Sequence, residues 1–174
     1  DEVTQTLTEH PRAYLLITNS PNECVVGGDR KAILALVADL NCSLHPIQGV
    51  TTVHCEVAEP VKKPYRELHL FETHPPKEVS FYSGILGKAY EVTRDSAADS
   101  IVEQSMQPFD YTKVIQSAYA DGVRIFIEMG PGATCSRMVD QILDDKPHIA
   151  KAICVKNHDS VSNVLHCLGQ LIAE

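Results

Sequence analysis

Apolar and polar positions along the first third of the chain alternate between a period typical of short strands and one typical of helices. The pattern predicts a helix, two strands, a second helix and a third strand, at residues 3–9, 13–18, 24–26, 30–40 and 43–47. The second helix has one wide apolar face, made by Ile33, Leu34, Leu36, Val37 and Leu40. Asp29, directly before it, is placed to accept backbone N–H bonds as its cap.

The order helix, strand, strand, helix, strand indicates a split βαβ, or ferredoxin-like, unit that lacks its first strand. We therefore assign residues 1–49 to an incomplete ferredoxin-like small subdomain. A sheet without one of its strands has an unpaired edge, so we expect an upstream piece to supply the missing strand or another segment to cover the edge.

From residue 50 onward the pattern is first loose and then regular. Prolines interrupt a weakly helical segment at residues 63–71, after which strands and helices alternate at residues 79–85, 97–105, 110–120, 124–129, 133–143, 150–155 and 160–172. Alternation of this kind predicts a parallel sheet covered by helices. The fold class is thus α/β, with residues 50–174 as the C-terminal part of a parallel, hydrolase-like large subdomain.

Composition narrows the function classes. Hydrophobic residues make up 44% of the chain, and 15 basic against 23 acidic residues give a net charge of −8 and a pI near 5.4. An acidic chain has no electrostatic reason to bind phosphate backbones, so we expect no nucleic-acid partner. No apolar run approaches the roughly 18 residues that a membrane span needs, and we expect no membrane span and a cytoplasmic location.

Cysteines and histidines are numerous but lack metal-ligand spacing. The six cysteines include no CxxC pair, and the eight histidines include neither an HxxxH nor an HExxH pair. We therefore expect reduced thiols and no metal site.

His54 is the best single candidate for chemistry. It follows the segment GVTTV at the point where the small unit ends and the larger layer begins, and clefts form at such boundaries. An imidazole there is able to act as a general base near neutral pH, whereas the alternative is a hydrogen-bonded structural histidine. Cys55 is not expected to be a nucleophile, because adjacent residues on an extended chain point to opposite faces.

The segment Met129-Gly130-Pro131-Gly132 lies between a predicted strand and a predicted helix. Glycines at a helix N-terminus are able to bring backbone N–H groups close to a ligand. The simpler interpretation is a tight strand-to-helix turn, and on the segment alone we favour it.

Several segments, taken in order, favour a catalytic role for His54 over a structural one. They are NSP at 19–21, VVGGD at 25–29, TVHC at 52–55, VEQSMQPFDYTKVI at 102–115 and IFIEMGPG at 125–132. In this order and spacing the chain resembles the acyltransferase family, which includes malonyl-CoA:carrier-protein transacylases and the acyltransferase domains of polyketide and polyunsaturated-fatty-acid synthases. The segment HPRAYLLITNSPNECVVGGDR looks most like the last group.

The resemblance implies a ping-pong mechanism in which a serine attacks a thioester and a histidine takes its proton. His54 matches the family's histidine, and Gln104 stands at the place of the residue that accepts a hydrogen bond from the other imidazole nitrogen. Acyl-CoA is then the donor substrate, and the acceptor is the phosphopantetheine thiol of a partner acyl carrier protein. The implied parent protein is a large multi-enzyme, with no cofactor bound to this chain.

The chain also departs from the family. It contains no GHSxG elbow, no GQGxQ start and no arginine in the carboxylate-binding context. These features belong to the family's first half, so we expect the nucleophile on an upstream half of the domain and no catalysis by this chain alone. Thr51-Thr52-Val53 replace the residues that correlate with acyl choice, and Thr52, Val53 and Ser83 are expected to line the substrate site.

Two alternatives remain open. The chain could be a non-catalytic module that docks a carrier or partner domain, in which case an oriented His54 has no purpose. It could also be a small metal-binding protein, which elemental analysis of the purified chain would reveal.

Overall fold

The computed structural model describes residues 2–50, 52–156 and 159–173, which form two compact units, residues 1–114 and 115–174. The subdomain boundary predicted after residue 49 falls inside the first unit. It stays a prediction about the complete domain, because a compact unit of this chain need not coincide with a subdomain of a longer one.

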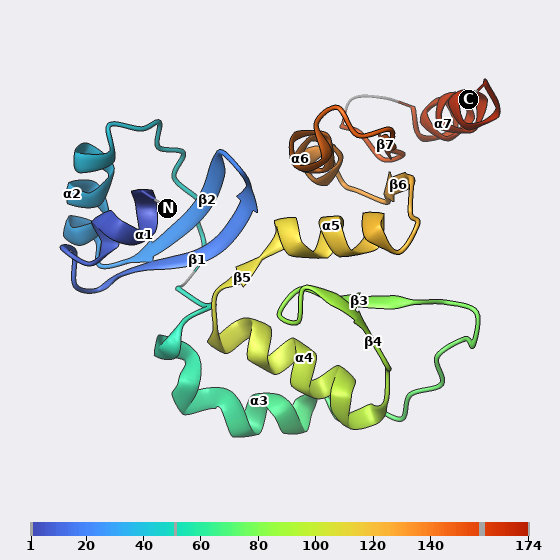
Figure 1. Ribbon diagram of the computed structural model, residues 1–174. Coiled ribbons are helices and arrows are strands. Elements are labelled where there is room, and N and C mark those ends of the chain that lie inside the picture. The colour runs from blue at the N-terminus through green and yellow to red at the C-terminus, as the bar shows by residue number, and fades with distance from the viewer. Residues whose placement is uncertain (1, 51, 157–158, 174) are drawn as a thin grey trace. The chain divides into compact units, whose positions relative to one another are not determined.

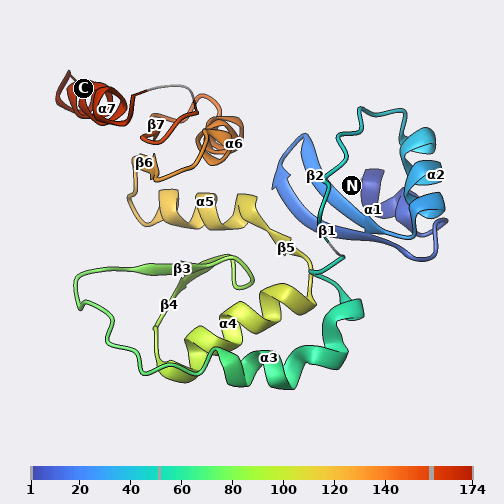
Figure 2. The ribbon, with the colours of Figure 1, turned by 180° about the vertical axis from the view of Figure 1, so that it is seen from behind.

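The first unit begins with a hairpin and two helices. Its elements are α1 (Glu2–Leu7), β1 (Ala13–Ser20), β2 (Glu23–Gly28) and α2 (Arg30–Leu40). β1 and β2 pair antiparallel, and α1 and α2 lie on one side of the hairpin (Figures 1 and 2). Asp29 caps α2 as predicted, since its carboxylate accepts from the backbone N–H groups of Lys31 and Ala32.

The predicted strand at residues 43–47 is wrong. Residues 42–50 have no regular secondary structure, and Leu44 and Ile47 lie exposed. The third strand of the described sheet is instead β5 (Phe109–Asp110), which pairs in parallel with β1. The apolar residues Leu44 and Ile47 favour a strand when only their neighbours in sequence are considered. The strand that pairs with β1 lies far downstream, and a local pattern cannot reveal such a partner.

The rest of the first unit surrounds a pair of helices. Its elements are η1 (Glu56–Val61), α3 (Lys62–Leu68), β3 (Phe81–Ser83), β4 (Lys88–Tyr90) and α4 (Arg94–Met106). α3 and α4 lie side by side, and β3 and β4 form a small antiparallel hairpin (Figures 1 and 2). Thr93 and Ser96 start α4 with a capping box.

One buried stripe fixes α4 in place. Ala98, Val102 and Met106 recur at intervals of four residues and are all buried, so the same face of α4 is turned inward along its length. The last turn of α4 is therefore held firmly, and this turn positions the candidate site.

Strand and helix alternate in the second unit. After α5 (Tyr111–Ala120), which crosses from one unit to the other, come β6 (Ile125–Glu128), α6 (Thr134–Leu143), β7 (Ile149–Ala152) and α7 (Ser160–Ala173). β6 and β7 pair in parallel. The mixed α/β class is confirmed, and the finer division into ferredoxin-like and hydrolase-like parts stays a prediction. Among the described residues, no helix is both long and apolar enough to cross a membrane.

Candidate functional site

His54 is tied twice to the end of α4. Its backbone N–H donates to the carbonyl of Ser105 at 2.8 Å, and its ring Nδ1 donates to the carbonyl of Gln104 at 2.5 Å. The last carbonyls of a helix have no partner within the helix, so they are available acceptors. His54 satisfies two of them, and this fixes both its backbone and its ring.

The bond at Nδ1 decides which ring nitrogen is the base. A backbone carbonyl only accepts hydrogen bonds, so the proton of the neutral ring belongs on Nδ1. Nε2 then has a free lone pair, which is what proton abstraction needs.

An aromatic ring and an uncommon backbone conformation complete the surroundings of His54. Phe109, at the start of β5, packs edge-on against the imidazole with ring centroids 5.2 Å apart. The φ angle of His54 is 63°, in the left-handed region that non-glycine residues rarely adopt. Such conformations persist where surrounding contacts hold them, and they cluster at functional sites.

Gln104 meets His54 through its main chain. The oxygen within hydrogen-bond distance of Nδ1 is the backbone carbonyl, while the side-chain amide lies against Gly84. A Cβ on Gly84 would lie 2.7 Å from Oε1 of Gln104, so the glycine leaves room for this amide. The structure thus brings Gln104 and the imidazole together through the main chain, and the catalytic role of Gln104 stays a prediction that is taken up below as a proposal.

The three residues expected to line a substrate site lie in different surroundings. Thr52 packs beside Gly27 of β2, and Val53 is half-buried next to His54. Ser83 is buried, and its hydroxyl lies 2.5 Å from that of Ser100. Thr51 lies outside the described residues. A role in substrate binding stays a prediction for all of them, and for Ser83 the hydroxyl already has a partner within the protein.

The glycine turn after β6 is closely packed. Gly130 has a φ of 82°, and a Cβ there would lie 2.6 Å from Cβ of Cys154. The N–H of Gly132 donates to the carbonyl of Cys154 at 2.8 Å. These contacts support the simpler interpretation, in which the glycines allow a tight turn against the segment that follows β7.

Glu128, just before this turn, does the work of a helix cap. Its carboxylate accepts from the backbone N–H of Ser136 at 2.7 Å and from the hydroxyl at 2.8 Å. Burial raises the pKa of Glu128, but the hydrogen bonds donated at the start of α6 outweigh burial, so the net pKa is lowered.

A cleft of about 270 Å³ lies close to His54 in the first unit. It shares Phe109 with the imidazole contact and Gly84 with the Gln104 contact. Its walls combine apolar side chains with two charged ones, including Leu15, Ile85, Pro108, Asp110 and Lys113. A mixed lining of this kind suits a ligand that is partly apolar.

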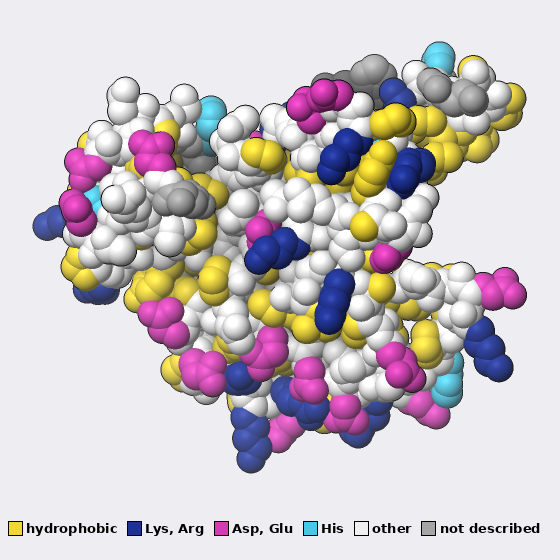
Figure 3. Space-filling model, in the orientation of Figure 1, with side chains coloured by type: hydrophobic (Ala, Val, Ile, Leu, Met, Phe, Trp, Pro, Cys, Tyr) yellow, Lys and Arg dark blue, Asp and Glu magenta, His cyan; other side chains and the backbone are white. Residues whose placement is uncertain are grey.

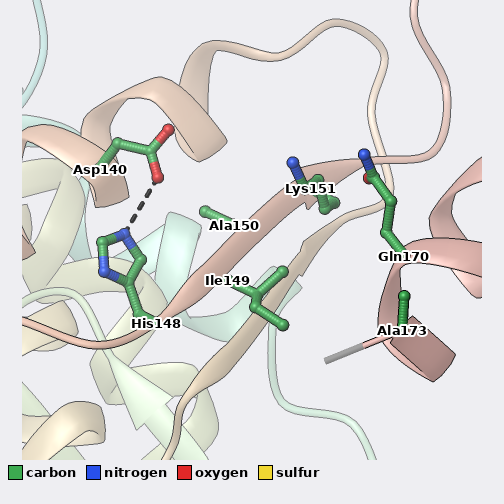
Figure 4. Close-up of a pocket in the computed structure, with 7 residues that line it drawn as sticks. All are labelled: Asp140, His148, Ile149, Ala150, Lys151, Gln170 and Ala173. Atoms are coloured by element: carbon green, nitrogen blue, oxygen red, sulfur yellow. Dashed lines mark hydrogen bonds and ion pairs between the residues drawn. The ribbon is translucent and has the colours of Figure 1, made fainter.

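A second pocket, of about 250 Å³, lies in the second unit between α6, β7 and α7 (Figure 4). His148 lines it and is held at both ring nitrogens, by the carboxylate of Asp140 at 3.0 Å and the carbonyl of Lys146 at 2.7 Å. Each ring nitrogen of His148 thus faces an acceptor of the protein itself, which occupies the space that a reacting group would need. In the part of the chain that the structure describes, no cluster of three or more metal-ligating side chains occurs.

Sequence reasoning missed two contributors to the site. Ser105 acts through its backbone carbonyl, which no sequence pattern reports. Phe109 lies within the QPFDY segment, which the motif comparison already included. Its contact with His54, however, depends on the pairing of β5 with β1, which the motif does not reveal.

Comparison with known proteins assigns the fold. No family model matches the chain. One of the polyunsaturated fatty acid synthase subunits of Thraustochytrium sp. is 22% identical over 171 residues, covering 91% of this chain and 8% of that protein. The acyltransferase domain from the second module of the salinomycin polyketide synthase superposes with a TM-score of 0.82 at 21% identity, covering 98% of this chain and 41% of that one.

A malonyl-CoA:acyl carrier protein transacylase from Xanthomonas oryzae gives a TM-score of 0.79 at 19% identity, with 97% of this chain and 53% of that one covered. The homologues of the chain are thus polyunsaturated-fatty-acid and polyketide synthases, and its fold is that of acyltransferase domains. The resemblance drawn from the motifs is confirmed at this level. The chain spans a small part of the synthase and about half of the solved chains.

Proposed function

We propose that this chain is the histidine-bearing part of an acyltransferase that moves an acyl group from coenzyme A to the phosphopantetheine thiol of an acyl carrier protein. The observation that supports it most is the ring of His54, whose Nδ1 is held by the carbonyl of Gln104 so that Nε2 is free. A structural histidine has no need of a free nitrogen, whereas a general base does.

In the proposed reaction a serine from the upstream half of the domain attacks the thioester carbonyl, and its proton passes to Nε2 of His54. Coenzyme A leaves as a thiol with that proton, which gives an acyl-serine. The phosphopantetheine thiol of the carrier then attacks the acyl-serine, and its proton travels by the same nitrogen to restore the serine hydroxyl. Gln104 orients the base throughout, as the third member of a triad does.

The names of the compared proteins support the substrate and partner classes. One solved neighbour is a malonyl-CoA:acyl carrier protein transacylase, and another is an acyltransferase domain of a polyketide synthase. Thr52 and Val53, next to the base, are proposed to contact the acyl group. Because they differ from the residues that accompany malonyl or methylmalonyl selection in polyketide synthases, we assign no acyl preference.

The test replaces His54 by alanine in the complete protein that carries the serine, and measures transfer of acyl groups from coenzyme A to a carrier protein. We expect the rate to fall by about 10² to 10⁴, the usual contribution of a general base. The 174-residue chain alone should give no transfer, and robust transfer by the chain alone would contradict an upstream nucleophile.

His69 provides a matched control. Its Nδ1 also donates to a backbone carbonyl, that of Tyr65 at 2.7 Å, and its ring packs against the ring of Tyr65. His69→Ala should therefore disturb the fold about as much as His54→Ala does, while leaving transfer intact. Unchanged transfer in His54→Ala would instead favour the docking module, which needs no oriented imidazole.

A further inference from the structure

The last turn of α4 sets the position of His54, so whatever holds this turn also holds the base. The carbonyls of three successive residues in the turn are all engaged. Glu103 accepts from the backbone N–H of Gln107 at 3.0 Å, and the carbonyls of Gln104 and Ser105 accept from His54. A rotation or lift of the turn would move both acceptors of His54 at once.

The carboxylate of Glu103 anchors this turn at both of its oxygens. Oε1 lies 2.7 Å from Nζ of Lys62, and Oε2 accepts from the side-chain amide of Gln107 at 2.5 Å. The hydrogen bond to Glu103 raises the pKa of Lys62, so the ammonium keeps its charge. Both side chains are about one-third exposed, so the pair contributes mainly geometry and only modestly to stability.

Lys62 belongs to the chain segment that leaves His54. It is the first residue of α3, eight residues after His54, and α3 follows directly on η1. The contacts therefore close a loop: the chain runs from His54 to Lys62, an ion pair leads to Glu103, and the next residue, Gln104, returns to the imidazole.

Arg66 joins the same two helices by two further ion pairs, which do not involve this turn. Arg66 of α3 binds Asp95 at 2.8 Å and Asp99 at 2.5 Å, nearer the start of α4. Figure 3 shows acidic and basic side chains side by side along the edge that α3 and α4 form. Removing an ion pair of Arg66 therefore tests a general effect on the packing of α3 and α4, whereas removing the pair of Lys62 with Glu103 tests a specific effect on His54.

We propose that Glu103, held by Lys62, is a positioning residue that fixes the tautomer and orientation of the His54 ring. It acts through the backbone carbonyls of the last turn of α4 and touches no reacting atom. This inference rests on the proposed function only in giving His54 the role of base; the geometry that it describes does not depend on that role.

The direct test is ¹⁵N NMR of the histidine rings in the 174-residue chain. The parent should show His54 as one tautomer, protonated at Nδ1. Glu103→Ala should produce averaged or broadened ring signals as Nδ1 loses its fixed acceptor, whereas Asp99→Ala, which removes a paired carboxylate from the same helix, should leave them unchanged. The double exchange Lys62→Glu with Glu103→Lys rebuilds the pair and should restore the single tautomer.

Urea unfolding of the same variants shows whether they are matched in stability. Unchanged His54 signals in Glu103→Ala would overturn the proposal, and so would an equal change in Asp99→Ala. Should Glu103→Ala prove too unstable to measure, Lys62→Met removes the same ion pair and is expected to alter the same signals.

Activity in the complete protein supplies a separate readout. Glu103→Ala should lower kcat about threefold to tenfold with KM within about twofold, because a displaced base slows the chemical step more than binding. Asp99→Ala should leave both values unchanged. If His54→Ala leaves transfer intact, the proposed function fails while the NMR result still decides the positioning role; a normal kcat in Glu103→Ala with His54 essential overturns the positioning role alone.

Discussion

His54 combines three features that single residues seldom share: a left-handed backbone, a bonded Nδ1 and an aromatic neighbour. A φ of 63° costs about 1 kcal/mol or more for a residue with a side chain. Two hydrogen bonds to the end of α4 hold the residue there. The strain is explained if the chain turns sharply at this residue in order to aim the ring, and this is what a positioned base requires.

Ser83 is the residue at which a structural and a functional role can be told apart. Its hydroxyl is buried and bonded to that of Ser100, and it also accepts from the N–H of Leu86 at 3.4 Å. Ser83→Ala would remove the partner of the half-buried Ser100 hydroxyl. We expect a loss of about 1 to 2 kcal/mol in the free energy of unfolding, measured in urea, and an unchanged KM for the acyl donor.

Ser100→Ala should cost a similar amount, and the double variant should cost less than the sum of the two, because no hydroxyl is then left unpaired. A raised KM in Ser83→Ala with normal stability would contradict this structural role and support the predicted contact with substrate.

At the level of helices and strands, local signals were reliable where they depend on near neighbours in sequence. The helix at Arg30–Leu40 was predicted with its bounds and its Asp29 cap, because periodicity and capping are local. The strand predicted at 43–47 is wrong. The pattern did not predict β5, because its two residues, Phe109 and Asp110, form a strand only by pairing with β1. Capping of α6 from Glu128 was likewise invisible, since the carboxylate comes from the preceding strand.

The role of Glu128 gives a dependence of stability on pH. Its folded pKa lies below the ordinary carboxyl value of about 4.3, so its contribution is fully present above that pH and is lost as the pH falls through the folded pKa. Glu128→Gln should therefore lower the free energy of unfolding, measured in urea at pH 7, by about 1 kcal/mol. This difference from the parent should shrink below about pH 4.

Glu67 is the control for this prediction, because it is an exposed glutamate on α3 that caps no helix. Glu67→Gln should match the parent at both pH values. A difference between Glu128→Gln and the parent that stays constant down to pH 3 would show that the carboxylate stabilises the fold through packing, not through its charge.

On the scale of the whole molecule, the sequence predicted the α/β class and the acyltransferase resemblance, and it singled out His54 and Gln104, which the structure brings into contact. Motifs could do this because they record order and spacing along the chain. They could not reveal that Gln104 acts through its carbonyl, that Ser83 is bonded to Ser100, or that Glu103 is anchored by Lys62. Each of these depends on how segments far apart in sequence meet.

Exposed apolar surface in the second unit points to a further contact. Ile125, Ile127 and Met129 at β6 are 49%, 43% and 72% exposed, although strand residues of this kind are usually covered in a parallel sheet. The solved acyltransferase chains are about twice as long as this one. We infer that the upstream half of the domain, which is proposed to bring the serine, covers this surface.

Mixing the chain with the upstream half of the same protein, made as a separate polypeptide, tests this. Burial of the β6 residues should raise the unfolding temperature and reduce the binding of an apolar dye, because apolar area leaves water.

Transfer from acyl-CoA to a carrier protein should then occur, though neither half shows it alone. A His54→Ala chain should associate equally well and stay inactive, which separates assembly from catalysis. Unchanged dye binding in the mixture would show that the upstream half does not cover β6, whatever the activity.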